Sequence, residues 1–251
     1  MSNDFSFSAA ESQAFGFRIF RAKLENGDPR FLTEHIEQEK PDILISRIDV
    51  KLQKALFSIL RNFPESYLAD TLVYYAGNVK DATLELPNGV EIRQAGIQDE
   101  EIISGLIKRI FSGYENHYHS SPIFNKVNLA QGYMEWTQPY LRDSDKCCFM
   151  ILDNGVPAGF LTARIDAENS YADIILNGVL KEYEGQGKYS FLIRHLKKEL
   201  FTTGIKKVMV STQLNNQRVQ SVWMKEGMYP YQSFYTFHHY ISEKAKQAIN
   251  I

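Results

Sequence analysis

The chain has 251 residues, 44% of them hydrophobic, which is enough for one large or two modest domains with a substantial core. Its 28 basic and 30 acidic residues nearly cancel, so the bulk charge gives no argument for a nucleic-acid or anionic-membrane partner. Cys147 and Cys148 are adjacent and cannot supply a disulfide framework, and no signal-peptide pattern or long apolar run is present. We therefore expect a cytoplasmic protein that does not insert into membranes.

The first 85 residues are expected to form a small α/β domain. Residues 1–14 are polar and are expected to be irregular. Asp28 is the predicted N-cap of the first helix, and Pro29 lies in its first turn. The predicted elements are strands at 15–23, 43–46 and 72–75 and helices at 28–40 and 52–60. The turn Pro87-Asn88-Gly89 predicts the domain boundary.

Residues 86–251 are expected to form the larger domain. It opens with a strand at 90–94, followed by helices at 99–111 and 129–141 with an aromatic, histidine-bearing loop at 114–124 between them. Asp153-Asn154-Gly155 predicts a hairpin between strands 148–152 and 156–165. Further strands are expected at 174–180, 207–212 and 234–240, and a helix carrying Val219, Val222 and Trp223 should end at Gly227.

A glycine turn, Tyr183 to Ser190, separates strand 174–180 from a helix whose leucines recur every four residues at 192, 196 and 200. Gly185 and Gly187 have no side chains, so the backbone can approach an anion and adopt positive φ. A strand-to-helix turn of this kind binds phosphate through backbone N–H groups and the helix dipole. The glycines alone are a weak signal, because many such turns are only tight bends.

Two motifs follow one another in this domain: Val179-x-x-x-Tyr183-x-Gly185-Gln186-Gly187, and a second that runs from Asn216 through Trp223 to Gly227. Together they resemble those of the GNAT superfamily of acyl-CoA-dependent N-acyltransferases, over about 160 residues from Val90 onward. The resemblance implies an α/β fold with a central mixed, mostly antiparallel sheet flanked by helices. It also implies coenzyme A as co-substrate, with no metal. The implied CoA-binding residues are Val179, Leu180, Gly185, Gln186, Gly187, Lys188, Tyr189, Ser190, Asn216 and Trp223.

A closer likeness is to the bacterial TDP-fucosamine acetyltransferases, carried by Phe15-Gly16, Arg164 and the run Ser211 to Asn216. This likeness implies that the acceptor is the free amine of a dTDP-linked amino-dideoxyhexose, used in O-antigen and other surface polysaccharides. The acyl group would be acetyl or a longer one such as 3-hydroxybutanoyl. The N-terminal domain would belong to the acceptor end of the enzyme or serve as a homodimer interface.

Three residues depart from the GNAT pattern. Glu184 replaces an arginine or glutamine, Tyr189 replaces a small residue, and Trp223 lies where many members carry a tyrosine. An indole N–H has no useful acidity, so Trp223 cannot protonate the leaving thiolate. These departures leave two alternatives open: a GNAT enzyme acting on another amine, such as a protein N-terminus or an antibiotic, and a non-catalytic CoA-binding module.

The chemistry requires a base for the amine, backbone donors for the oxyanion and an optional acid for the thiol. Val179 and Leu180 are the predicted backbone donors, at a strand end where a bulge would separate two strands. His117 and His119 are candidate bases, with Asp173 as an alternative; packing or surface roles remain the plain alternative for each.

The acceptor-side candidates are Tyr114 and Arg164, whose guanidinium suits a diphosphate, although Arg164 also fits an exposed strand position. Tyr229 is a candidate acid, with aromatic packing as the alternative. His117-x-His119 has no third ligand at a usual spacing, so no metal site is predicted.

Overall fold

The fold was obtained as a computed structural model, which describes residues 3–28, 30–81, 84–124 and 129–249. Ten strands among these residues form one sheet, in the order β1-β2-β3-β10-β4-β9-β8-β7-β6-β5. Most neighbouring strands are antiparallel, and the parallel pairs are β2 with β3 and β8 with β9. The predicted mixed, mostly antiparallel sheet flanked by helices is confirmed.

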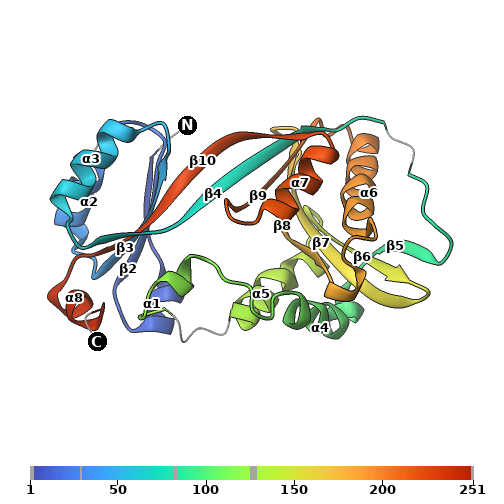
Figure 1. Cartoon of the computed structure of the whole chain (residues 1–251), viewed down its shortest axis with the longest axis horizontal. Coiled ribbons are helices and arrows are strands. Elements are labelled where there is room, and N and C mark those ends of the chain that lie inside the picture. The colour runs from blue at the N-terminus through green and yellow to red at the C-terminus, as the bar shows by residue number, and fades with distance from the viewer. Residues whose placement is uncertain (1–2, 29, 82–83, 125–128, 250–251) are drawn as a thin grey trace.

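The N-terminal part alternates strands and helices as expected (Figure 1). Its elements are β1 (Asp4–Phe7), α1 (Ala9–Phe15), β2 (Ile19–Leu24), α2 (Arg30–Glu39), β3 (Ile43–Asp49), α3 (Gln53–Asn62) and β4 (Ser66–Asn78). Asp28 Oδ1 accepts the Arg30 N–H at 3.0 Å, as a capping side chain does, whereas Pro29 lies outside the described residues.

Residues 4–15 are not irregular, contrary to the prediction. They form β1, which pairs antiparallel with β2, and the short helix α1. Gly16 ends this helix with φ of 72°, a left-handed conformation that glycine adopts without strain. The predicted strand at 15–23 therefore begins only at Ile19.

The C-terminal part follows the predicted order closely. Its elements are β5 (Val90–Gln94), α4 (Glu100–Ile110), α5 (Leu129–Thr137), β6 (Lys146–Asp153), β7 (Val156–Asp166), β8 (Tyr171–Val179), α6 (Lys188–Thr202), β9 (Lys207–Gln213), α7 (Gln217–Lys225), β10 (Met228–Tyr240) and α8 (Glu243–Ile249). Short 3₁₀ helices lie at Ile97–Asp99, His117–Ser120, Gln138–Leu141 and Lys181–Tyr183. Asn154 and Gly155 have φ of 48° and 77°, so the predicted hairpin turn between β6 and β7 is confirmed.

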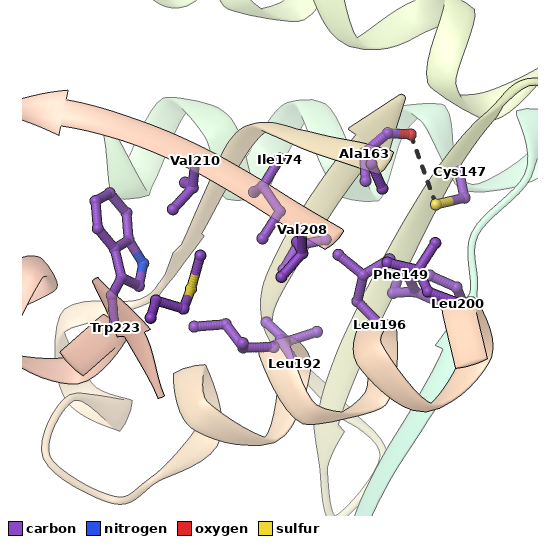
Figure 2. Packing of buried hydrophobic residues seen from close by; sticks show 14 of the residues in the cluster. Cys147, Phe149, Ala163, Ile174, Leu192, Leu196, Leu200, Val208, Val210 and Trp223 are labelled. Carbon is purple, nitrogen blue, oxygen red and sulfur yellow. Dashed lines mark hydrogen bonds between the residues drawn. The ribbon is translucent and has the colours of Figure 1, made fainter. Parts of the chain in front are cut away.

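Side chains of β6 alternate between two apolar layers. Cys147, Phe149 and Ile151 pack with Leu192 and Leu196 of α6, as Figure 2 shows for most of this cluster. Cys148 and Met150 lie in the other layer, with Ile103 and Ile107 of α4. Both thiols are buried and free, so the predicted packing role of the cysteines is confirmed.

Two long strands cross from one half of the sheet to the other (Figure 1). β10 pairs with β3 over Phe234 to Tyr240 and with β4 over Met228 to His239. β4 in turn pairs with β9. A strand from the N-terminal part therefore lies between two strands of the C-terminal part, and the sheet passes across the predicted boundary at residue 85. The division into two domains at this boundary stays a prediction.

Candidate functional site

The sheet opens where β8 and β9 diverge. Their parallel pairing covers only Tyr171 to Ile174 against Lys207 to Val210, although both strands continue further. A bulge lies at the same place in β8, because Ala163 of β7 faces Ile174 while Leu161 faces Asn177. The Thr162 hydroxyl fills the gap in the ladder: Oγ1 accepts the Leu176 N–H and donates to the Leu176 carbonyl, both at 3.0 Å.

A cavity of about 290 Å³ follows this opening to the glycine turn. Gly178, Val179, Gly185, Tyr189 and Asn216 are among the residues that line it. The turn has the predicted geometry for backbone contact with an anion. Gly185 and Gly187 have φ of 76° and 77°, and α6 begins at the next residue, where the first N–H groups of a helix have no intrahelical partner.

The two predicted backbone donors differ in availability. The Leu180 N–H donates to the Ala158 carbonyl at 2.8 Å, and the Leu180 side chain is buried, so this residue is committed to the sheet. Bonded and non-bonded pairs alternate in an antiparallel ladder, so the N–H of Val179, opposite Gly159, is directed away from β7. Val179 lines the cavity and is the donor that the geometry favours.

Side chains around the turn pair with one another. The Lys188 ammonium is buried, lies 3.0 Å from Asp153 and donates to Gln186, so it does not face the cavity as an anion-binding cation. Glu184 forms an ion pair with Arg218, and both residues line this cavity. Arg218 thus supplies a cation beside position 184, where GNAT proteins usually have an arginine or glutamine. Ser190 is half-buried and is absent from the lining of the described cavities.

A second cavity, of about 640 Å³, lies between the N-terminal part and the open end of the sheet. Elements far apart in the sequence line it: Glu11 from α1, Arg21 from β2, Arg47 from β3, Asp70 from β4 and Asp173 from β8. The two cavities meet, because Phe111, Tyr114, Asn177, Asn216 and Val219 line both. We call the smaller one the cofactor cavity and the larger one the acceptor cavity.

Asp173 is the predicted base that the geometry supports. Its side chain lines the acceptor cavity and is 26% exposed, and burial raises the pKa of its carboxyl to about 6. The guanidinium of Arg164, 4.0 Å away, opposes this rise in pKa. A carboxyl with a pKa near 6 is ionised at neutral pH and basic enough to accept an ammonium proton.

The histidines have different surroundings. His117 lines the acceptor cavity, but its side chain is 7% exposed, its Nδ1 lies 3.0 Å from Nε2 of His238, and burial lowers its pKa well below the usual value. Neutral His117 is therefore a poorer base than Asp173. His119 is exposed, and its Nδ1 accepts the Asn116 N–H at 3.1 Å, so it closes its own turn and lines neither described cavity.

The remaining candidates also separate by position. Tyr114 lines both cavities and donates to Gln213. Tyr229 and Arg164, which are 49% and 48% exposed, line neither cavity, so the geometry supports neither an acid role for Tyr229 nor a diphosphate contact for Arg164. Trp223 is buried against the acceptor cavity, and its Nε1 donates to Tyr189 Oη at 2.8 Å.

Sequence reasoning missed the polar wall that the N-terminal part contributes. Arg21 donates twice to Glu11, at 2.7 and 2.8 Å, and once to Tyr118 at 2.7 Å. Arg47 and Asp70 lie further along the same wall. Arg47 could have indicated this wall from the sequence alone, because it interrupts the apolar run 43–49. A charged residue in such a strand is rarely buried without a partner.

Comparisons with known proteins agree on the fold. Residues 112–228 match the family model described as "Acetyltransferase (GNAT) family", and no curated protein matches the sequence. A GCN5-related N-acetyltransferase from Sphaerobacter thermophilus is similar in structure, with a TM-score of 0.65 and 13% identity over 89% of this chain and 73% of that one. Another from Kribbella flavida has a TM-score of 0.57 and 14% identity over 91% and 83%. At this identity the structures support the fold alone.

Among the described residues, no helix is long and apolar enough to cross a membrane, and no group of three or more His, Cys, Asp or Glu residues is arranged to hold a metal ion. The family match, the open sheet and the glycine turn agree with one another on the fold. Residues 112–228 match the GNAT acetyltransferase family model, and the chain has the GNAT fold.

Proposed function

We propose that the chain transfers an acyl group from CoA to the free amine of a dTDP-linked amino-dideoxyhexose, for O-antigen or other surface polysaccharide. The observation that carries the proposal is the meeting of the two cavities, with Asp173 on the acceptor side and the Val179 N–H on the cofactor side. An amine in the larger cavity and a thioester in the smaller one would meet at Asn177 and Asn216, which line both.

The residues then have the following roles. Asp173 accepts a proton from the ammonium, and the neutral amine attacks the thioester carbonyl. The Val179 N–H donates to the oxyanion of the tetrahedral intermediate. Both reactants are held at once, so the transfer is direct and needs no acyl-enzyme. Gly185, Gln186 and Gly187 and the first turn of α6 bind the pyrophosphate through backbone N–H groups.

A row of unpaired polar atoms supports a polar acceptor. Arg47, Thr236 and Asp70 are neighbours across β3, β10 and β4. Arg47 Nε, Thr236 Oγ1 and Asp70 Oδ1 are the buried side-chain atoms of the described residues that have no hydrogen-bond partner. Leaving such atoms unpaired costs roughly 1–3 kcal/mol each, so Arg47 and Asp70, which line the acceptor cavity, are suited to bonding with a bound molecule.

The dTDP-sugar fits this wall in three respects. The Arg47 guanidinium offers donors to a diphosphate. The Asp70 carboxyl, whose pKa is raised by burial, lies beside Arg47 on the same wall and offers a further polar group to the sugar. Trp136 lines the same cavity and is 59% exposed, and its ring offers a stacking surface to a thymine base.

The test is thiol release from acetyl-CoA and from 3-hydroxybutanoyl-CoA, with dTDP-linked 3-amino and 4-amino dideoxyhexoses as acceptors. We expect release to require one of these sugars, and the same sugar without dTDP to be a much poorer substrate. Release with peptide N-termini or aminoglycosides but not with the nucleotide sugars would favour a GNAT enzyme for another amine. CoA binding without release in the presence of any amine would indicate a non-catalytic module.

A further inference from the structure

Tyr189 occupies an unusual position between the two cavities. It lies in the first turn of α6, and its ring lines the cofactor cavity. Its hydroxyl accepts the indole N–H of Trp223, which lines the acceptor cavity, and donates to Asn177, which lines both. The phenol oxygen is therefore held between residues that line the two cavities.

We propose that Tyr189 is the general acid that protonates the departing CoA thiolate. This assignment rests on the acyltransfer chemistry proposed above, but it does not depend on the identity of the acceptor. When the tetrahedral intermediate collapses, the C–S bond breaks and the electron pair remains on sulfur. The Tyr189 O–H gives its proton to that sulfur, which releases CoA thiol and leaves a phenolate. Solvent then returns a proton to the phenolate.

The hydrogen bonds of Tyr189 suit this role. Burial raises the pKa of the phenol, so the proton is present at neutral pH. Once the proton has left, the Trp223 N–H still donates to the oxygen and stabilises the phenolate, because an indole does not ionise in this range. The Asn177 amide can rotate to present its N–H₂ in place of its oxygen.

The two departures from the family pattern thus compensate for each other. Trp223 fills the place of a tyrosine on α7 and cannot act as an acid, whereas Tyr189 on α6 brings a phenol to the indole nitrogen. Tyr114 also lines both cavities, but it is hydrogen-bonded to Gln213 at the end of β9. Asn177, which holds Tyr189, lies two residues from the proposed oxyanion donor Val179 on β8.

The first test measures the leaving-group dependence of Tyr189→Phe. With acetyl-CoA we expect kcat to fall about 100-fold, the size of effect typical for a lost general acid, with KM for acetyl-CoA within about threefold of wild type. With an aryl thioester, whose thiolate needs no proton, the loss should shrink to less than about threefold. An equal loss with both donors would show that Tyr189 is structural.

Tyr75→Phe is the matched control. Tyr75 is buried, its ring centroid lies 5.3 Å from that of Trp223, and its hydroxyl donates to Gln220 at 3.2 Å. It lines neither described cavity. The control therefore loses one buried hydrogen bond beside the same indole, and its activity should depend on the leaving group as in wild type.

The second test needs no acceptor. We expect the thiol of bound CoA, titrated by thiolate absorbance, to have a pKa at least about one unit lower in the wild type than in Tyr189→Phe, because the phenol donates to the thiolate. Trp223→Phe should give an intermediate value. An unchanged thiol pKa in a folded, CoA-binding Tyr189→Phe variant would overturn the assignment, whatever the acceptor is. If the wild type did not bind CoA, both the proposed function and the role of Tyr189 would be overturned. If it released thiol with other amines but not with the nucleotide sugars, only the proposed acceptor would be overturned.

Discussion

Replacing Asp173 with Asn should stabilise the protein and abolish most of its activity. The pKa of the Asp173 carboxyl is raised from 3.8 to about 6, mainly by burial. Each unit corresponds to about 1.36 kcal/mol, so ionising this group in the folded state costs up to about 3 kcal/mol. The pKa of the carboxyl is higher in the folded state than in the unfolded state. The protonated carboxyl therefore contributes its full stabilisation below about pH 4, and this stabilisation is lost as the pH rises through about 6.

The gain should therefore depend on pH. Asparagine stays neutral, so Asp173→Asn and the wild type should have similar Tm at pH 4, whereas at pH 8 the variant should be more stable. For a chain of this length, about 3 kcal/mol corresponds to a rise in Tm of roughly 6–12 °C. If Asp173 is the base, kcat should fall by about 100-fold or more.

Asp166→Asn is the control of opposite sign. Hydrogen bonds from Asn169 lower the pKa of the Asp166 carboxyl, so its removal should not stabilise the protein at pH 8. Equal Tm of wild type and Asp173→Asn at pH 8 would refute the argument from burial. Unchanged kcat in the variant would refute the assignment of the base.

Four further outcomes are expected. In the wild type, kcat/KM should rise with pH through about 6, as Asp173 loses its proton. Arg164→Met should raise the pKa seen in this profile by roughly 0.7 pH unit, because a charge at 4.0 Å in a water-like dielectric contributes about 1 kcal/mol. Gly187→Val should weaken CoA binding more than tenfold in calorimetry, because φ of 77° there resists a β-branched residue, whereas Gly204→Val, at the same φ outside the turn, should not. Arg47→Met should raise KM for the nucleotide sugar at least tenfold and leave KM for acyl-CoA unchanged; equal effects on both would contradict an acceptor role. Thr162→Val should lower the free energy of unfolding by about 1–3 kcal/mol in urea titrations, because it leaves the Leu176 N–H unpaired at the bulge.

Local patterns predicted most of the C-terminal elements. The alternation in β6, the Asn154-Gly155 turn and the spacing of Leu192, Leu196 and Leu200 each specify structure within a few residues of themselves. The glycine turn belongs to the same class, since positive φ at Gly185 and Gly187 is a local requirement. For these segments sequence and tertiary structure agree, so periodicity was sufficient.

The acceptor cavity could not be predicted in the same way. Arg21, Asp70 and Asp173 lie on different strands, and only the order of those strands in the sheet brings them to one cavity. Pairing between β4 and β9 joins residues about 140 positions apart, such as Leu72 with Gln213, and leaves no periodic signal in either segment. The hydrogen bond between Trp223 and Tyr189 is a similar case, because each residue alone looked like a loss of function.

The position of β4 has a consequence for how the protein is made. β4 leaves the ribosome well before β9 and β10, the two strands between which it pairs. Until β9 has been synthesised, β4 has both edges open, and the edge that pairs with β10 stays open until that last strand follows. Loop closure over such a distance is slow, so sheet completion should be a late, post-translational event. A nascent chain of this protein is therefore expected to depend on chaperones more than an enzyme whose strands pair in order of synthesis.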